Sequence, residues 1–253
     1  MPDVRTERLA RTRSLIDAAA RIVVLTGAGI STDSGIPDFR GPNGLWTTNP
    51  AAERLSDLRS YLDDPELRRQ TWRSRATHPA WQAEPNAAHL ALVALEKTGR
   101  LHTLVTQNID GLHQRAGSSP GRVVEIHGTM FATECLSCDD RRTMRAALDR
   151  VAAGEPDPGC RVCGGILKAA TVSFGQPMDM AVLHRAEDAV NSCDLLLVVG
   201  SSLTVQPAAG LVSTAALAGA TVVVCNASRT PYDGLATVVL REPIGEILPA
   251  LLG

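Results

Sequence analysis

The sequence predicts an α/β protein with a parallel sheet and two insertions. Short apolar runs alternate with Ala- and Leu-rich stretches of helical spacing, and glycine or polar residues follow each apolar run. Two longer segments break the alternation. A chain of 253 residues can bury a sizeable core.

Five apolar runs are predicted to be buried strands, because each is short, apolar and bounded by turn-forming residues. They are residues 22–26, 101–106, 123–126, 195–199 and 221–225. The stretches between them have helical spacing over residues 87–97, 181–191 and 207–218.

Two insertions interrupt this pattern. Residues 41–85 are polar and Arg-rich and carry three tryptophans, and residues 132–167 hold four cysteines. We expect residues 1–253 to form a single unit. In it, a large lobe takes about residues 1–40, 86–131 and 168–253, and the helical and cysteine-bearing insertions form a small lobe.

Polar or glycine clusters follow all five predicted strands. They are Gly27 to Ser31, Gln107 to Asp110, His127 with Gly128, Gly200 to Ser202, and Asn226 to Ser228. Ligands of open α/β sheets bind outside the carboxyl ends of the strands. The clusters are therefore expected to converge on one edge of the sheet.

The first cluster is a glycine-rich turn at Gly27 and Gly29. Such a turn suits close approach of a pyrophosphate to backbone N–H groups, although a tight turn without a ligand explains the two glycines equally well. Thr32 stands where the third glycine of a dehydrogenase fingerprint belongs, and no acidic strand end follows about twenty residues on. Hydride transfer is therefore disfavoured.

The clusters after the second and third strands carry the groups best suited to chemistry. Asn108 and Asp110 alternate with apolar Ile109, so both can face a ribose, and either can instead cap a turn. His127 can accept a proton from a hydroxyl near neutral pH. A structural role is its alternative, but its position among the clusters favours a base. The remaining histidines are interpreted as structural: His78, His89, His102, His113 and His184.

Two C-x2-C pairs, Cys135 with Cys138 and Cys160 with Cys163, match the spacing of a zinc ribbon. Four thiolates close the coordination sphere, so one structural zinc is predicted. Redox pairs or reduced thiols are the alternatives. A zinc ribbon also occurs in nucleic-acid binders, but acidic residues offset the arginines here and aromatic residues for stacking are lacking.

Composition disfavours several classes of function. The net charge of −2 gives no footprint for nucleic acid, and no apolar run is long enough to span a bilayer. Residues 1–13 lack the apolar stretch of a signal peptide, so we expect a cytosolic protein without a membrane partner. Arginines at 5, 8, 11 and 13 leave a mitochondrial presequence as an alternative, but acidic residues interrupt them. The oligomeric state is open.

Taken together, the motifs resemble those of the sirtuin family over nearly the whole chain. They are Gly27-Ala28-Gly29-Ile30-Ser31, Gly35-Ile36-Pro37-Asp38-Phe39-Arg40, Thr106-Gln107-Asn108-Ile109-Asp110, His127-Gly128, the four cysteines, Phe174-Gly175 and Gly200-Ser201-Ser202-Leu203. The resemblance implies a Rossmann-like domain and a zinc-binding small domain. NAD, consumed as a co-substrate, and an acyl-lysine peptide would meet in the cleft between them.

The resemblance also implies roles for individual residues. Ala28, Asp38, Phe39 and Arg40 line the cofactor-binding loop, with Gly27 and Gly29 in its turn, and Gly200, Ser201, Ser202 and Asn226 lie on the adenosine side. Gln107, Asn108 and Asp110 hold the nicotinamide ribose, and His127 is the general base. Val172, Phe174 and Gly175 pair with the substrate backbone. Gln176 departs from the usual Glu, which leaves its peptide contacts open.

The implied activity is removal of acyl groups, above all acetyl, from protein lysine. Its products are nicotinamide, free lysine and O-acyl-ADP-ribose. Mono-ADP-ribosyl transfer is the alternative enzyme activity, and a non-catalytic NAD-binding module is the alternative binding function. The presence of both Asn108 and His127 argues against a pure sensor.

The acyl preference depends on Trp72 and Arg75. This segment resembles the sirtuin branch that removes succinyl and malonyl groups, where a Tyr and an Arg three residues later bind the acyl carboxylate. Trp72 replaces that Tyr while Arg75 remains. A core tryptophan and an exposed arginine are the alternative interpretation. We expect acetyl-lysine to be accepted, and acidic acyl groups to be accepted weakly and through Arg75.

Overall fold

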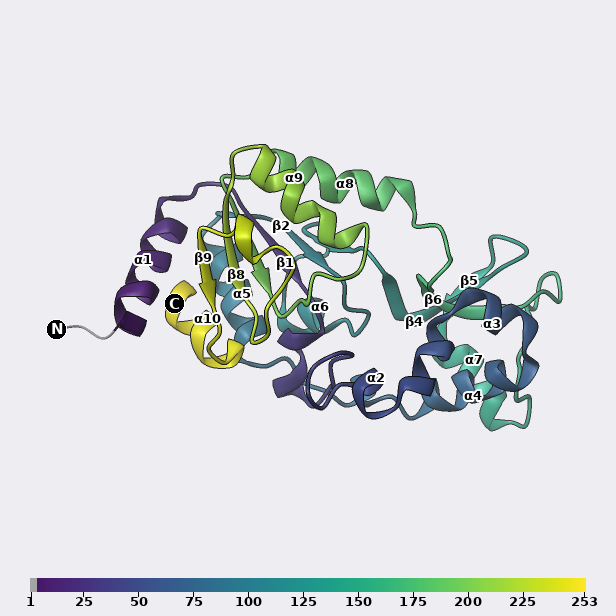
Figure 1. Cartoon of the computed structure of the whole chain (residues 1–253). Coiled ribbons are helices and arrows are strands. Elements are labelled where there is room, and N and C mark those ends of the chain that lie inside the picture. The colour runs from purple at the N-terminus through teal and green to yellow at the C-terminus, as the bar shows by residue number, and fades with distance from the viewer. Residues whose placement is uncertain (1–3) are drawn as a thin grey trace.

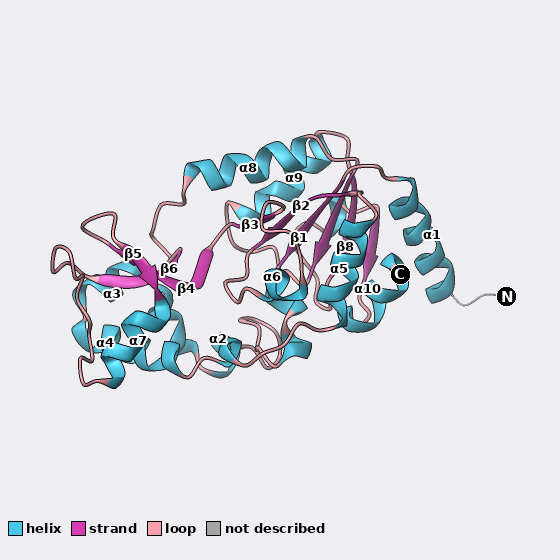
Figure 2. Cartoon of the chain, turned by 180° about the vertical axis from the view of Figure 1, so that it is seen from behind, coloured by secondary structure: helices cyan, strands magenta, loops and turns pink. Residues whose placement is uncertain are grey.

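The computed structural model describes residues 4–253 and shows two sheets side by side (Figure 1 and Figure 2). Helices cover both faces of a six-stranded sheet, and a three-stranded sheet with its own helices lies beside it. Residues 1–3, which the sequence assigned to the large lobe and to the N-terminal segment, lie outside the described residues.

The strands are β1 (Ile22–Thr26), β2 (Leu101–Thr106), β3 (Val123–Glu125), β4 (Gly128–Cys135), β5 (Arg141–Thr143), β6 (Leu167–Thr171), β7 (Leu195–Val199), β8 (Thr221–Cys225) and β9 (Val238–Leu240). The α-helices are α1 (Val4–Ala18), α2 (Leu45–Thr48), α3 (Leu58–Asp63), α4 (Pro65–Ala76), α5 (Ala87–Lys97), α6 (Leu112–Ala116), α7 (Met144–Ala152), α8 (Met180–Asn191), α9 (Leu211–Leu217) and α10 (Ile244–Leu252). Short 3₁₀ helices include η1 (Ala28–Ile30), η2 (Thr32–Ser34), η3 (Pro50–Ser56), η4 (Pro79–Trp81), η5 (Ala208–Gly210) and η6 (Asp233–Leu235).

The large sheet is parallel throughout, in the order β3-β2-β1-β7-β8-β9. The chain builds β2 and β3 on one side of β1 and then returns to place β7 on its other side. The strand order therefore reverses between β1 and β7. Ligands bind at such a reversal, outside the carboxyl ends of the strands.

Alternate residues of each central strand enter different cores. In β1, Val24 packs with α1, α5 and α10 on one face, whereas Val23 and Leu25 pack with α8 and α9 on the other. All five residues of β1 and of β7 are buried. This two-sided burial explains why the strands appear as continuous apolar runs.

Most predicted elements of the large sheet are confirmed. Predicted strands 22–26, 101–106, 195–199 and 221–225 and the helix 87–97 match at both ends, while strand 123–126 ends one residue early and helix 181–191 begins at Met180. The predicted helix 207–218 is divided into η5 and α9, and Gly210, a poor helix former, is the last residue of η5. The sequence missed α1, β9 and α10.

The three-stranded sheet, ordered β5-β4-β6, and helices α3, α4 and α7 form a small lobe beside the large one. Its sheet includes residues 128–131 and 168–171, which the sequence boundaries placed in the large lobe. Trp72 from α4 packs there with Met144 and Leu148 from α7 and with two of the four paired cysteines.

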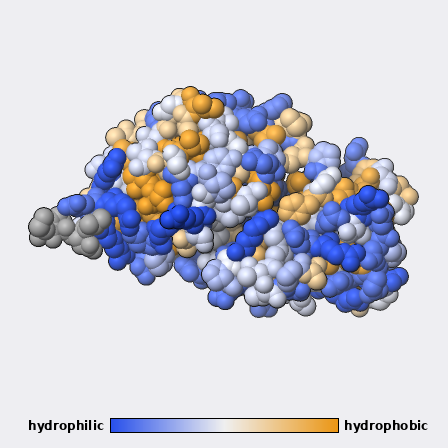
Figure 3. All heavy atoms as spheres, in the orientation of Figure 1, coloured by the Kyte–Doolittle hydropathy of each residue, from blue (hydrophilic) through white to orange (hydrophobic). Residues whose placement is uncertain are grey.

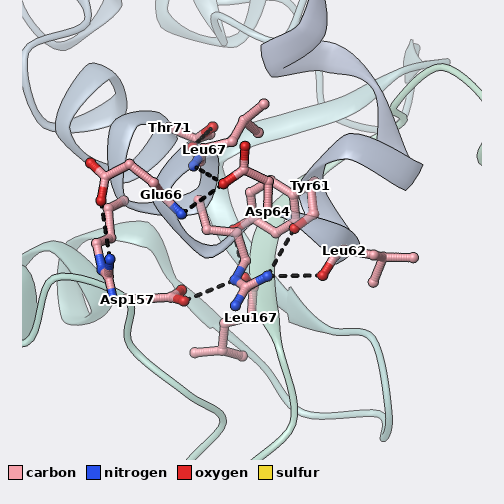
Figure 4. Close-up of polar contacts among 10 residues, drawn as sticks. Tyr61, Leu62, Asp64, Glu66, Leu67, Thr71, Asp157 and Leu167 are labelled. Atoms are coloured by element: carbon pink, nitrogen blue, oxygen red, sulfur yellow. Dashed lines mark hydrogen bonds and ion pairs between the residues drawn. The ribbon is translucent and has the colours of Figure 1, made fainter.

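Polar contacts tie the helical insertion to the cysteine-bearing one (Figure 4). The Tyr61 hydroxyl donates to the Leu167 carbonyl (2.7 Å), and Arg68 Nε donates to Asp157 Oδ2 (2.8 Å). The same guanidinium donates to the carbonyls of Tyr61 and Leu62. Because these groups are largely shielded from water, the contacts fix α3 and α4 against the second insertion.

Apolar side chains are unevenly distributed on the surface. On the face seen in Figure 3, hydrophilic residues cover much of the small lobe, and apolar residues gather near β8 and β9 and around the junction of the lobes. Within residues 4–253, no helix is long and apolar enough to cross a membrane.

Candidate active site

The five polar clusters follow β1, β2, β3, β7 and β8, which are neighbours in the sheet, so their ends meet at one edge. Main-chain hydrogen bonds continue the ladder beyond the strands. Gly27 N donates to Val199 O (3.0 Å), and Gln107 N donates to Thr26 O (2.9 Å). This edge is called the cofactor edge below.

Three glycines lock the loops after β1 and β7 together. A Cβ on Gly27 would lie 2.7 Å from Gly200 O, and one on Gly29 would lie 2.9 Å from Gly200 Cα. Gly200 has a φ of +63°, and a Cβ there would lie 2.5 Å from Ile30 N. Backbone packing by itself therefore requires these glycines.

Most amides of the glycine turn are used inside the protein. Gly29 N donates to Gly200 O (2.9 Å), Ile30 N to Gly27 O (3.1 Å) and Ser31 N to Ala28 O (3.0 Å). Ala28 begins η1, and its N–H has no hydrogen-bond partner among the described residues. The turn can therefore offer a phosphate the Ala28 amide rather than a row of amides.

A buried polar network joins the loops after β1 and β2. The Ser31 hydroxyl donates to Asp110 Oδ2 (2.8 Å), and Asn108 Nδ2 donates to Gly27 O (3.1 Å) and to Ser31 Oγ (3.2 Å). Burial raises the pKa of the Asp110 carboxyl, although hydrogen bonds from Leu112 N and Ser31 oppose the shift. Asn108 Oδ1 has no partner within residues 4–253, so it is free to accept a ligand hydroxyl.

Gln107 connects the loops after β2, β3 and β7. Its Nε2 donates to Ser201 Oγ (2.8 Å), and its main-chain carbonyl accepts from His127 Nδ1 (3.0 Å). Ser201 Oγ also accepts from Leu203 N (3.2 Å), so its own O–H is left to donate elsewhere. The sequence placed these residues together but did not foresee that Gln107 orients both.

The contact of His127 with the Gln107 carbonyl fixes the tautomer of the neutral imidazole. Because a carbonyl only accepts, the Nδ1 of the imidazole carries the hydrogen and Nε2 carries the lone pair. Burial lowers the pKa of His127, and the bond to Gln107 opposes this less strongly. The ring is therefore neutral near pH 7 and can accept a proton at Nε2.

Gly128 brings the second sheet close to this histidine. Gly128 has a φ of +72°, and a Cβ there would lie 2.1 Å from Ala170 O. The close approach lets Val172 N donate to His127 O (2.9 Å). His127 thus lies where the cofactor edge meets the segment after β6.

The segment Val172 to Gly175 already has partners in the chain. Phe174 N donates to Ser56 O (2.8 Å), and Phe174 O accepts from Leu58 N (3.0 Å). A peptide that pairs here would have to use other groups of the segment, such as the main chain of Gly175, for which no hydrogen bond is found within residues 4–253.

Gln176 takes part in a network inside the protein. Its Oε1 accepts from Ser173 N (3.2 Å), and its Nε2 donates to Glu134 Oε1 (3.2 Å). The same Glu134 oxygen accepts from the buried Lys168 (3.1 Å). A Glu at position 176 could not donate to Glu134 and would place two carboxylates together, so the amide suits this network.

Trp46 is a residue of this region that the sequence reasoning did not select. Its ring lies 4.7 Å from that of Phe39 and 5.7 Å from that of Phe174, and Arg40 lies over it at 4.4 Å. It thus joins the predicted cofactor loop to the predicted peptide segment. Asp38 shapes this loop by accepting from Gly41 N (2.9 Å). The sequence offered one indication of this role, because Trp46 closely follows the predicted cofactor loop and the glycines at 41 and 44.

Trp72 and Arg75 lie in different environments. Trp72 is 1% exposed and belongs to the core of the small lobe, which favours the core role that the sequence left open. Arg75 is half-buried, and its guanidinium has no hydrogen bond or ion pair with any described residue. Burial lowers the pKa of Arg75. It is a cation without a counter-charge.

Ser202 and Asn226 lie on the loops after β7 and β8. Ser202 Oγ is 3.0 Å from Thr204 Oγ1, and Asn226 Nδ2 donates to Ser228 O (2.9 Å). Arg241 donates to the carbonyls of Asn226 and Ser228 and thereby braces this loop.

The four paired cysteines come together as predicted. All four sulfurs lie within 4.8 Å of one another, with Cys135 Sγ 3.5 Å from Cys163 Sγ and Cys138 Sγ 3.7 Å from Cys160 Sγ. Tetrahedral zinc with Zn–S bonds of about 2.3 Å requires sulfurs about 3.8 Å apart. Backbone amides of Ser137, Val162 and Gly165 donate to three of the sulfurs. The cluster fits a structural zinc, with no open position for a water.

The chain is similar to known proteins over nearly its whole length. The model of the Sir2 family matches residues 27–207. "NAD-dependent protein deacetylase 2" of Streptomyces coelicolor is 52% identical over 231 residues, which cover 91% of this chain and 96% of that protein. "NAD-dependent protein deacylase" of Ralstonia nicotianae is 42% identical over 251 residues, covering 96% and 95%.

Solved structures give the same result. A complex described as Sir2, p53 peptide and NAD+ matches with a TM-score of 0.85 and 34% identity, covering 95% of each chain. A Sir2 variant with deacetylated p53 peptide and 3′-O-acetyl ADP-ribose matches with a TM-score of 0.88 and 33% identity, covering 96% of this chain and 97% of that one.

Proposed function

The chain belongs to the Sir2 family, and we propose that His127 is the general base of its NAD-dependent protein deacylation. The reaction consumes NAD and one water, removes an acyl group from protein lysine, and gives nicotinamide, free lysine and O-acyl-ADP-ribose. Bound NAD supplies the ribose carbon that receives the acyl oxygen as nicotinamide leaves. The other requirements fall on the residues of the cofactor edge and the segment after β6.

One observation carries the assignment of His127. Its Nδ1 is held by the Gln107 carbonyl, its Nε2 is unpaired among the described residues, and its own carbonyl accepts from Val172 N. The imidazole therefore lies between the two substrate regions with its lone pair available. It can take a proton from a ribose hydroxyl, which makes that oxygen nucleophilic.

Asn108 and Asp110 are proposed to position the ribose. Asn108 uses its amide nitrogen within the protein and keeps Oδ1 free, so it can accept a hydrogen bond from a ribose hydroxyl. The buried Asp110 carboxylate holds Ser31, which in turn orients Asn108. The attack of the acyl oxygen on the ribose carbon depends on positioning rather than on a strong nucleophile. Substitutions that disturb this network should therefore slow the reaction.

The phosphates and adenosine are proposed to lie along the loops after β1, β7 and β8. The Ala28 N–H and the Ser201 O–H are the free donors described above, and both suit phosphate oxygens. Ser202 and Asn226 continue the edge on the adenosine side. Asp38, Phe39 and Arg40 would close over the nicotinamide end, supported by the contact of Phe39 with Trp46.

The acyl-lysine peptide is proposed to lie along Val172 to Gly175, beside Phe174. Phe174 is 36% exposed, so its ring can contact the substrate. The preference for acetyl over acidic acyl groups remains a prediction, as do the cytosolic location and the sequence-derived boundaries of the two lobes.

Product analysis tests the function. The protein is incubated with NAD and a panel of acyl-lysine peptides, and the products are identified by mass spectrometry. We expect one nicotinamide and one O-acyl-ADP-ribose to form for each lysine that is released. ADP-ribose retained on protein, without O-acyl-ADP-ribose, would instead identify mono-ADP-ribosyl transfer.

A further inference from the structure

A separate cavity lies at the amino ends of β1, β2 and β3, at the opposite edge of the sheet from His127. Its volume is about 550 Å³, and its charged lining consists of Arg21, Arg122, Arg185 and Asp188, with His102 and His184. This cavity is called the back groove below. Its size lies within the range of small-molecule sites, about 300–1,000 Å³.

One face of α8 forms a wall of the back groove. His184, Arg185 and Asp188 follow helical spacing, so they project to the same side of the helix, and all three are exposed. The opposite face of α8 is buried against the sheet through Leu183 and Ala186. The charged wall is therefore held on a packed helix.

The other wall is also fixed by the fold. Asp194 Oδ2 accepts from the main-chain N–H of Ala20 (2.9 Å) and of Arg21 (2.7 Å), which anchors the chain just before β1. Arg122 Nη1 donates to the carbonyls of Leu101 and His102 at the start of β2. The contacts of Arg122 use main-chain acceptors and add no negative charge, whereas the Asp194 carboxylate is hydrogen-bonded to main-chain N–H groups.

The back groove has more positive than negative charge. Neither Arg21 nor Arg185 has a carboxylate within 4.0 Å among the described residues, and the one nearest to Arg122, that of Glu96, is 3.9 Å away. Arg21 Nη2 lies 2.7 Å from His102 Nε2, which must therefore accept and be neutral. Three guanidinium groups thus face a single lining carboxylate, Asp188.

Gly121 contributes an open position to the rim. A Cβ at Gly121 would meet no atom within 4 Å, so neither packing nor a positive φ requires a glycine here. A side chain at this position would extend into the groove beside Arg122 and Arg185, and no neighbouring atom would have to move to make room for its Cβ. The position offers a way to change the groove's charge while sparing the fold.

We propose that the back groove binds the phosphate groups of a small phosphorylated molecule, at a site separate from the cofactor edge. Guanidinium groups bind phosphate oxygens through paired, charge-assisted hydrogen bonds. Arg21 and Arg185 have N–H groups to spare and no ionic partner, and the excess positive charge matches a multiply charged anion. The site is independent of the deacylation chemistry.

Titration with inorganic pyrophosphate tests the proposal. The holoprotein is first saturated with ADP-ribose to fill the cofactor edge, and pyrophosphate binding is then followed calorimetrically at low ionic strength. Gly121→Glu adds a carboxylate to the rim, and Gly121→Gln is its neutral match. Gln70→Glu on the exposed face of α4 controls for net charge.

We expect saturable binding that is weakened about tenfold by Gly121→Glu and by Arg21→Gln, and that is unchanged by Gly121→Gln and Gln70→Glu. Added salt should weaken it. Binding that fails to saturate, or equal affinity in Gly121→Glu and Gly121→Gln, would overturn the proposal. A failure of ADP-ribose to bind would count against the proposed function and not against the groove, because the paired Gly121 variants still compare the groove alone.

Discussion

The two lobes of the protein are stabilised in different ways. The large lobe has a central sheet whose middle strands are wholly buried between two apolar clusters. The small lobe has a much smaller apolar cluster, which includes two cysteines of the metal set, and relies on contacts such as Arg68 with Asp157. Reactive groups on the large sheet can therefore be replaced without loss of the fold, whereas the small lobe depends on its metal and polar contacts.

Loss of zinc should have the largest effect. Cys160→Ala leaves three thiolates, and structural zinc sites contribute about 10–16 kcal/mol, comparable to the whole stability of a domain. We expect the small lobe to unfold and activity to disappear while the large sheet persists. Circular dichroism and metal analysis of the variant check this, with Cys193→Ala, a buried cysteine of the large lobe, as control. Full activity in pure protein that lacks zinc would refute a structural zinc.

His127→Ala should affect chemistry without affecting stability. General-base catalysis contributes about 10²–10⁴-fold, so kcat should fall by that factor while the melting temperature and NAD affinity change little. His78→Asn is a suitable control, because Asn can still accept from Ala80 N as His78 Nδ1 does. Wild-type turnover by His127→Ala would rule out the proposed base.

The unpaired Arg75 tests whether the small lobe also selects the acyl group. We expect acetyl peptides to be better substrates than succinyl peptides, and Arg75→Met to reduce kcat/KM for succinyl about tenfold, since a charged hydrogen bond contributes about 1.5–3 kcal/mol. Acetyl turnover should change little. Succinyl turnover above acetyl in the wild type would contradict the preference, and succinyl turnover unaffected by Arg75→Met would contradict the charge pairing.

Tyr61→Phe should weaken the small lobe modestly. It leaves the Leu167 carbonyl without its hydroxyl donor, which costs about 1–3 kcal/mol for a buried group. Urea unfolding followed by tryptophan fluorescence measures the change. Tyr232→Phe, whose hydroxyl lies on the partly exposed loop of the large lobe, should cost less because water can replace its contact with Gln206. Equal losses in the two variants would remove the contrast between the lobes.

The pH profile should show the smallest effect. His127 acts as a base only when neutral, and burial lowers its pKa below the usual 6.5. Activity is therefore retained as the pH falls past 6.5 and is lost only when it passes through the lowered pKa. The profile of kcat/KM gives this limb, with circular dichroism confirming that the protein stays folded. An acidic limb centred above 6.5 would conflict with this environment of His127.

The difference between the two lobes also explains which parts of the structure could be predicted from the sequence. Strands β1, β2, β7 and β8 were found at both ends, because burial on both faces makes them continuous apolar runs. The four cysteines were found because metal-ligand spacing is local. The convergence of Asn108 and His127 on one edge followed from the parallel sheet.

Other features depend on contacts that a sequence does not display. α10 contains Pro249 and follows Pro243, so its helical pattern was obscured, and β9 is only three residues long. The link from Gln107 to Ser201 and to His127 joins segments far apart in the chain. The position of Trp46 between Phe39 and Phe174 likewise exists only in the folded molecule.

The interlock of Gly27, Gly29 and Gly200 limits how the protein can be redesigned. A methyl group at any of the three positions would collide with main-chain atoms, so these three positions of the cofactor edge cannot take a side chain. A change of nucleotide preference would have to be introduced at neighbouring positions that carry side chains, such as Ser202 and Asn226. The interlocked main chain is thus a fixed support, and variation is left to the side chains around it.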